Sequence, residues 1–267
     1  MSKRKAVGEA QWLSLGSTYA LLRELTQHQR VARNAAGRRR LRLFACSCCR
    51  QFWHLFTDQH AQQAVEVAER FADGQARLDE LAAAERSAGD AERRAMSRIL
   101  ELTGGRGWLG PLPPDLEEAQ HARGTAAAAV AAAARAGLAV AAERAALQCV
   151  MVAATGRDRW EEGRPVQLAV DALQCDLLRD IFGNPFQPAT LDSAWLTWND
   201  AAVVRLAHAA YEERHLPAGT LDNGRLAVLA DALEEAGCTS EDILDHLRGP
   251  GTHVRGCWPV DLCLGKS

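Results

Sequence analysis

The sequence predicts an all-α protein, an irregular multi-helix bundle of about eight to ten helices with no significant β-sheet. Three observations support this prediction. Apolar residues recur at spacings of three and four along nearly the whole chain, as one face of a helix requires. The alternation of apolar and polar residues that marks half-buried strands is absent. Glycine and proline gather between the periodic segments, where they mark turns.

Four helices are predicted before a break at residues 103–114, which is rich in glycine and proline. Ser17 and Asp58 precede two of these helices, and their side chains can accept hydrogen bonds from free backbone N–H groups of the first turn. One helix is expected to stop at Asp73-Gly74, where glycine can take the left-handed conformation. The predicted helices cover residues 17–27, 38–56, 58–74 and 76–102.

An alanine-rich tract follows the break. Seventeen of the 33 residues in 122–154 are alanine. Alanine has the highest helix propensity and a side chain small enough for close contact between helices. The tract therefore predicts helix that serves packing.

The C-terminal part is expected to hold shorter helices separated by loops. Asp192 or Ser193 starts one of them, and Thr239 with Asp242 resembles a capping box that opens another. The last segment, from His253 to Leu264, is expected to be irregular or to form one short helix, with Trp258 docked on the core. The other predicted helices cover residues 166–182, 192–211, 226–236 and 239–247.

Length and composition indicate an ordinary folded protein. The chain has 267 residues, of which 48% are hydrophobic and 24% are charged, and these proportions exclude disordered and collagen-like classes. We expect a single helical domain over 1–267, with lobes at 1–156 and 157–267. The N-terminus lacks the apolar region of a secretory signal, and no apolar run approaches the roughly 20 residues of a membrane span. The expectation is a cytoplasmic protein with no membrane partner and with cysteines that form no disulfide framework.

The segment 38–56 has the most unusual composition, because it holds Cys46, Cys48 and Cys49 among apolar residues. A helix that is apolar on nearly all sides is normally buried, so these cysteines are first interpreted as core residues. The alternative is a zinc site. Cys46 and Cys49 have the C-x2-C spacing, and His253 and Cys257 have an H-x3-C spacing, so the two pairs together can supply a tetrahedral Cys3His site. Two further candidate ligands are Cys238 and His246.

A second alternative is nucleic-acid binding through the arginine-rich segment 30–50. Residues 1–50 hold eleven basic residues against two acidic ones, although the whole chain has a net charge of −3. Such a run is typical of a phosphate-binding face, but it is equally typical of a solvated helix start. No helix-turn-helix, zinc-finger or RNA-recognition signature accompanies it. The candidate phosphate contacts are Arg38, Arg39, Arg40 and Arg42.

No motif points to an enzyme. The sequence has no G-x-S-x-G, P-loop, H-E-x-x-H or G-x-G-x-x-G pattern, and candidate bases such as His208, His246, His253 and Asp261 have no diagnostic spacing. The function that the sequence favours is a non-catalytic helical module for interaction or regulation, with another protein as its partner. Zinc binding and nucleic-acid binding are the two alternative functions.

Six motifs are spread over nearly the whole chain. They are RLRLFACSCCRxxWH at 40–54, where x is any residue, AVEVAERFADG at 64–74, LLRDIFGNPF at 177–186, AWLTWND at 194–200, LADALEEAGC at 229–238 and HVRGCWPVDL at 253–262. Together they resemble an uncharacterised bacterial protein family that has no established function. The resemblance implies no activity and no catalytic residue. It implies that the two cysteine-containing motifs belong to one protein pattern, which favours a contact between them. Departures from the pattern are Pro259 and the longer loop at 217–224.

Overall fold

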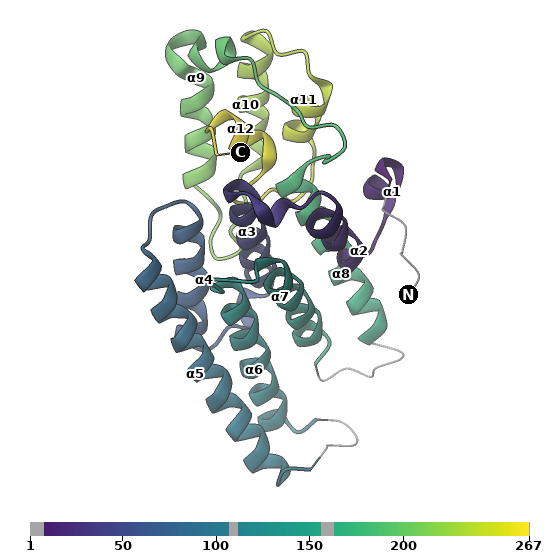
Figure 1. Cartoon of the computed structure of the whole chain (residues 1–267), viewed down its shortest axis with the longest axis vertical. Coiled ribbons are helices and arrows are strands. Elements are labelled where there is room, and N and C mark those ends of the chain that lie inside the picture. The colour runs from purple at the N-terminus through teal and green to yellow at the C-terminus, as the bar shows by residue number, and fades with distance from the viewer. Residues whose placement is uncertain (1–7, 107–111, 156–162, 267) are drawn as a thin grey trace. The chain divides into compact units, whose positions relative to one another are not determined.

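A computed structural model of the chain describes residues 8–106, 112–155 and 163–266 (Figure 1). Within these ranges the chain forms twelve α-helices, and its β-structure is limited to isolated bridges that Thr220 makes with His215 and Val254. The all-α class is confirmed, with more helices than expected because several are only six residues long. None of the described helices is long and apolar enough to cross a membrane.

The chain divides into two compact units. We call Leu15–Cys175 the N-terminal unit, and Met1–Ser14 with Asp176–Ser267 the C-terminal unit. The lobe boundary predicted at residues 156 and 157 lies outside the described residues. The division between the two units falls within helix α8, Gly163–Phe182.

Helix α1, Glu9–Ser14, belongs to the C-terminal unit although it begins the described chain. The indole of Trp12 is fully buried, and its Nε1 donates to the Gly183 carbonyl at 3.1 Å. In return, the Arg179 guanidinium donates to the Trp12 carbonyl at 3.0 Å. These contacts hold α1 against the C-terminal end of α8, so sequence position alone does not decide its unit.

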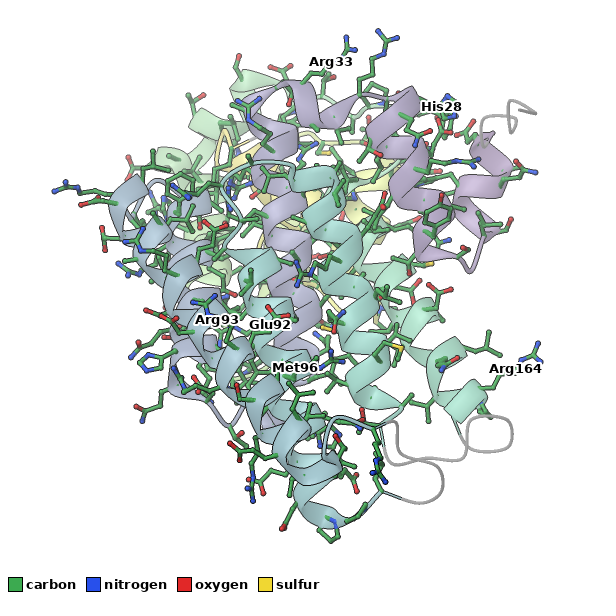
Figure 2. The ribbon with its side chains drawn as sticks, turned by 60° about the horizontal axis from the view of Figure 1, so that its bottom comes forward. His28, Arg33, Glu92, Arg93, Met96 and Arg164 are labelled. Atoms are coloured by element: carbon green, nitrogen blue, oxygen red, sulfur yellow. The ribbon has the colours of Figure 1, made fainter. Side chains whose placement is uncertain are left out.

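The N-terminal unit is a bundle of long helices. Asp58 caps α4 as predicted, since its Oδ1 accepts from the backbone N–H of His60 at 2.8 Å. The predicted helix 38–56 begins earlier, at Ala35, because the Asn34 side chain caps it by accepting from Gly37 N at 2.6 Å, and it ends earlier, at Gln51. The outward face of α5 carries Glu92, Arg93 and Met96 (Figure 2). The helices are α2 Thr18–Arg23, continued by a π turn over Glu24–His28, then α3 Ala35–Gln51, α4 Gln59–Ala72, α5 Leu78–Thr103, α6 Pro114–Ala132, α7 Leu138–Ala153 and the first part of α8.

The alanine-rich tract is divided between α6 and α7, which pack against each other. The chain turns between them at Gly137, which has a φ of 64° in the left-handed region. The small residues allow a close approach. A Cβ added to Gly124 in α6 would lie 2.3 Å from Cγ2 of Val152 in α7. The alanine-rich tract therefore forms two helices, and it serves the close helix packing that the sequence predicts.

The C-terminal unit packs α9 to α12 around a core that includes Tyr211, Leu229 and Val260 (Figure 1). Asp192 caps α9 as predicted, because its Oδ1 accepts from Ala194 N at 2.9 Å. The N-cap of α11 is Ser240 and not the predicted Thr239. The helices are α9 Ser193–Glu212, α10 Asn223–Glu235, α11 Glu241–Arg248 and α12 Trp258–Cys263, and the backbone leaves helical geometry inside α9 at residues 198–201.

Candidate metal centre

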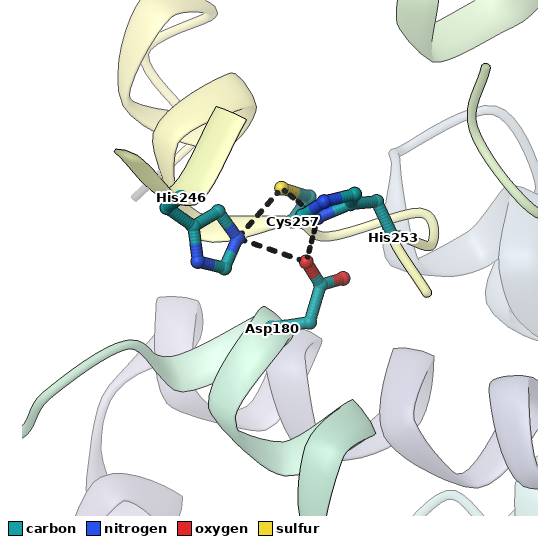
Figure 3. A group of neighbouring side chains, drawn as sticks. All are labelled: Asp180, His246, His253 and Cys257. Carbon is teal, nitrogen blue, oxygen red and sulfur yellow. Dashed lines mark hydrogen bonds and ion pairs between the residues drawn. The ribbon is translucent and has the colours of Figure 1, made fainter. Parts of the chain in front are cut away.

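Four side chains with metal-ligating atoms meet in the C-terminal unit (Figure 3). They are Asp180, His246, His253 and Cys257, and one ligating atom from each lies within 4.8 Å of the others. Asp180 comes from α8, His246 from α11, and the other two from the segment that leads into α12. Among the described residues this is the group that brings three or more such ligands together.

Backbone contacts hold the segment that carries His253 and Cys257. The Val254 N–H donates to Asp180 Oδ2 at 2.9 Å, which ties the segment to the end of α8. The Leu221 N–H also donates to the His253 carbonyl at 2.8 Å. The Cys257 N–H in turn donates to the Val254 carbonyl at 2.9 Å, which closes a turn. The positions of both ligands are therefore fixed by local and long-range hydrogen bonds.

The ligating atoms surround a common point. Asp180 Oδ1 lies 2.7 Å from His253 Nδ1 and 3.0 Å from His246 Nε2. Cys257 Sγ lies 3.4 Å from His246 Nε2 and 3.8 Å from His253 Nδ1. These four contacts join an oxygen, two nitrogens and a sulfur into one cluster (Figure 3).

The cluster is largely shielded from water. Asp180 and His253 are each 4% exposed and Cys257 is fully buried, whereas the side chain of His246 keeps 21% of its surface accessible. Burial disfavours the charge of Asp180, but hydrogen bonds from His246 and His253 outweigh burial and lower its pKa. Burial opposes the charge of His253 as well, and the Asp180 carboxylate nevertheless raises its pKa. Burial and the Asp180 charge raise the pKa of the Cys257 thiol well above its usual value.

Groups around the cluster orient the two imidazoles. The indole Nε1 of Trp258 donates to His246 Nδ1 at 3.2 Å, and the two rings lie 5.3 Å apart. His253 Nε2 faces the Gly249 carbonyl at 3.4 Å. The His253 contact is of the kind that fixes the ring orientation of ligating histidines, in which the second ring nitrogen donates to a carbonyl oxygen.

A small pocket of about 280 Å³ opens beside the cluster. Its wall includes Asp180, His246 and His253, together with Arg179, Asp245 and Thr252. The exposed edge of His246 belongs to this wall, so the pocket gives an ion a route from solvent to the ligating atoms.

Two of the four predicted zinc ligands, His253 and Cys257, belong to the observed cluster. His246 is one of the two further candidates, and Asp180 is a ligand that the sequence does not predict. Cys46 and Cys49 lie in α3 of the N-terminal unit, and both are buried. Cys46 Sγ lies 3.8 Å from the Val65 carbonyl, and a sulfur contact with Cys149 together with burial raises the pKa of Cys49. These surroundings favour the core role that the sequence also suggested.

The arginines predicted to contact nucleic acid differ in exposure. Arg38 is exposed and Arg40 is half-buried. Arg39 pairs with the buried carboxylate of Asp73 at 2.9 Å. Arg42 is 4% exposed and donates to the Ala134 carbonyl at 2.7 Å, just beyond the end of α6. Arg39 and Arg42 therefore stabilise the fold, and nucleic-acid binding by this segment stays a prediction.

In comparisons with protein-family models, curated proteins and solved structures, the chain matches none of them at a significant level.

Proposed function

We propose that the protein binds a transition-metal ion, preferentially Zn²⁺, through Asp180, His246, His253 and Cys257. The observation that carries the proposal is the convergence of the four ligating atoms within 4.8 Å of one another. Three of the four residues are buried, so an ion held among them would be largely shielded from water.

The donor set favours zinc. Imidazole nitrogen and cysteine thiolate are ligands that Zn²⁺ prefers, and a thiolate disfavours Mg²⁺ and Ca²⁺, which take oxygen ligands. Bonds of about 2.0 to 2.3 Å in a tetrahedron place neighbouring donor atoms roughly 3.3 to 3.8 Å apart. The contacts of Cys257 Sγ with the two imidazoles, at 3.4 and 3.8 Å, already match this range. The shorter contacts of Asp180 would lengthen by a few tenths of an ångström.

A site closed by four protein ligands is typical of a structural ion. Here the ion would join α8, α11 and the segment before α12, which are far apart in the sequence. Its expected role is to stabilise the C-terminal unit as a scaffold, in keeping with a non-catalytic module for interaction or regulation.

The test is elemental analysis of the untagged protein, paired with thermal unfolding before and after chelation. We expect about one zinc per chain and a lower Tm once the ion is removed. Cys257→Ser and His246→Gln should lose the ion. Cys238→Ser is the matched control, since Cys238 is a buried cysteine of the same unit outside the cluster. A wild-type protein that takes up no zinc even after reconstitution, or a Cys257→Ser variant that binds it equally well, would show the proposal to be wrong.

A further inference from the structure

The N-terminal unit holds a second feature, an apolar pocket of about 670 Å³ between α2, α7 and the first part of α8. Its apolar lining is formed by Tyr19, Leu22, Val140, Leu147, Val150 and Leu168. All of the lining residues belong to the N-terminal unit, so the pocket is independent of the metal cluster. Its volume falls within the range of about 300 to 1,000 Å³ that is usual for small-molecule sites.

Four apolar side chains that line this pocket are largely exposed to solvent. Tyr19, Val140, Leu147 and Leu168 are between 57% and 69% exposed, and all four line the same pocket. The floor is buried, since Leu22 is only 1% exposed. Single exposed apolar residues are common, but a concave group of them marks a binding site.

Some polar groups at the rim of the pocket already form ion pairs or hydrogen bonds within the chain, and others do not. Arg144 pairs with Glu92 at 3.2 Å, and Asp171 Oδ1 accepts from the Thr18 N–H at 2.9 Å. Arg164 and Gln167 contact no polar partner in the described part of the chain, and their spacing of three places them on one face of α8. Figure 2 shows the Arg164 side chain extended from the first turn of α8.

The rim carboxylate of Glu143 makes no ion pair with Arg164 in the described part of the chain. Burial raises the pKa of Glu143, which favours its neutral form relative to an exposed carboxylate. Among the described residues, Arg164 is the rim arginine that makes no ion pair, and a ligand that complements its guanidinium carries a negative head group.

We infer that the pocket binds a linear aliphatic carboxylate. The carboxylate pairs with the Arg164 guanidinium and accepts from the Gln167 amide. The alkyl chain lies along Val140, Leu147 and Leu168 and ends over Leu22. This ligand combines an apolar body that fits the walls with an anionic head group that can pair with Arg164.

Isothermal titration calorimetry with sodium dodecanoate below its critical micelle concentration tests the inference. We expect saturable binding to the full-length protein, with a chain-length series from octanoate to dodecanoate gaining up to roughly fourfold in affinity per buried CH₂. The cationic analogue dodecyltrimethylammonium should bind at least about threefold more weakly, because it meets Arg164. Absence of dodecanoate binding, or equal affinity for the cationic analogue, would overturn the inference.

Two pairs of variants locate the site. Leu147→Asp should abolish dodecanoate binding, whereas Val228→Asp, at an exposed apolar residue of the other unit, should leave it unchanged. Arg164→Gln should weaken binding about threefold to tenfold, and the exposed Arg33→Gln, outside the pocket, should have no effect. Circular dichroism of each variant verifies folding. Unchanged affinity in a folded Leu147→Asp protein would contradict the assignment.

Discussion

The indole Nε1 of Trp258 donates a hydrogen bond to Nδ1 of His246 at 3.2 Å. A neutral imidazole carries one proton, so an accepting Nδ1 places that proton on Nε2. Nε2 is the atom that faces Asp180 Oδ1 at 3.0 Å and Cys257 Sγ at 3.4 Å. A metal ion bound at Nε2 needs the lone pair there and moves the proton to Nδ1. The Trp258 hydrogen bond and the metal ion therefore compete for the same imidazole.

Trp258→Phe should tighten zinc binding, because it removes the hydrogen bond that holds His246 in the competing tautomer. One such bond contributes about 0.5 to 1.5 kcal/mol, which corresponds to roughly a twofold to tenfold change in Kd. Competition with a chromophoric chelator measures the change. Trp195→Phe, in the same unit but outside the cluster, should leave the Kd unchanged. Weaker zinc binding by Trp258→Phe would mean that Trp258 supports the liganded form instead.

The stability of the metal-free protein should depend on pH through Asp180 and His253. Their contact lowers the pKa of Asp180 and raises that of His253. The Asp180 contribution is complete above its unfolded pKa of about 4 and is lost as the pH falls through the folded value. The His253 contribution is complete below its unfolded pKa of about 6.5 and is lost as the pH rises through the folded value. The contact between Asp180 and His253 therefore contributes most to the free energy of unfolding between about pH 4 and pH 6.5.

Urea unfolding of the chelated protein at about pH 5.5 and about pH 8.5 measures this dependence. The pair should contribute more to the free energy of unfolding at the lower pH. His253→Gln should remove that part of the dependence, whereas His208→Gln, at an exposed histidine, should keep it. Identical pH profiles for the wild type and His253→Gln would contradict the assigned ion pair.

Gly183→Ala should destabilise the C-terminal unit. Gly183 has a φ of 63°, and an added Cβ would lie 3.1 Å from the ring of Trp258. Gly137→Ala is the matched control, because its φ is 64° and an added Cβ would meet nothing within 4 Å. Both variants should lose about 1 kcal/mol from the left-handed backbone, and Gly183→Ala should lose roughly a further 1 kcal/mol from the displaced indole. Equal losses in chemical unfolding would argue against the packing of Trp258 on Gly183.

Gly124→Ala should destabilise the N-terminal unit although alanine is the better helix former. Its Cβ would lie 2.3 Å from Cγ2 of Val152, and a β-branched valine has little freedom to turn away. The expected loss is about 1 to 3 kcal/mol of unfolding free energy. Gly89→Ala in α5 is the control, since its Cβ would have only ordinary contacts, and it should gain up to about 1 kcal/mol. A stabilising Gly124→Ala would show that α6 and α7 lie further apart.

Local sequence patterns were sufficient to predict the all-α class and several helix ends. Helical periodicity and caps such as Asp58 and Asp192 depend on residues within one or two turns, so they can be recognised locally. The spacing of His253 and Cys257 also marked them as a pair, because both lie in one short segment.

The residues that join this pair could be identified only from the folded chain. Asp180 lies 73 residues before His253, and its carboxylate is one of 34 acidic side chains, so no local pattern singles it out. Likewise, the local sequence does not place α1 with the end of α8, where Trp12 meets Gly183 across 171 residues. Such contacts are set by how helices bury their apolar faces against one another. That packing depends on the whole chain, whereas the helices themselves form through hydrogen bonds between residues four apart.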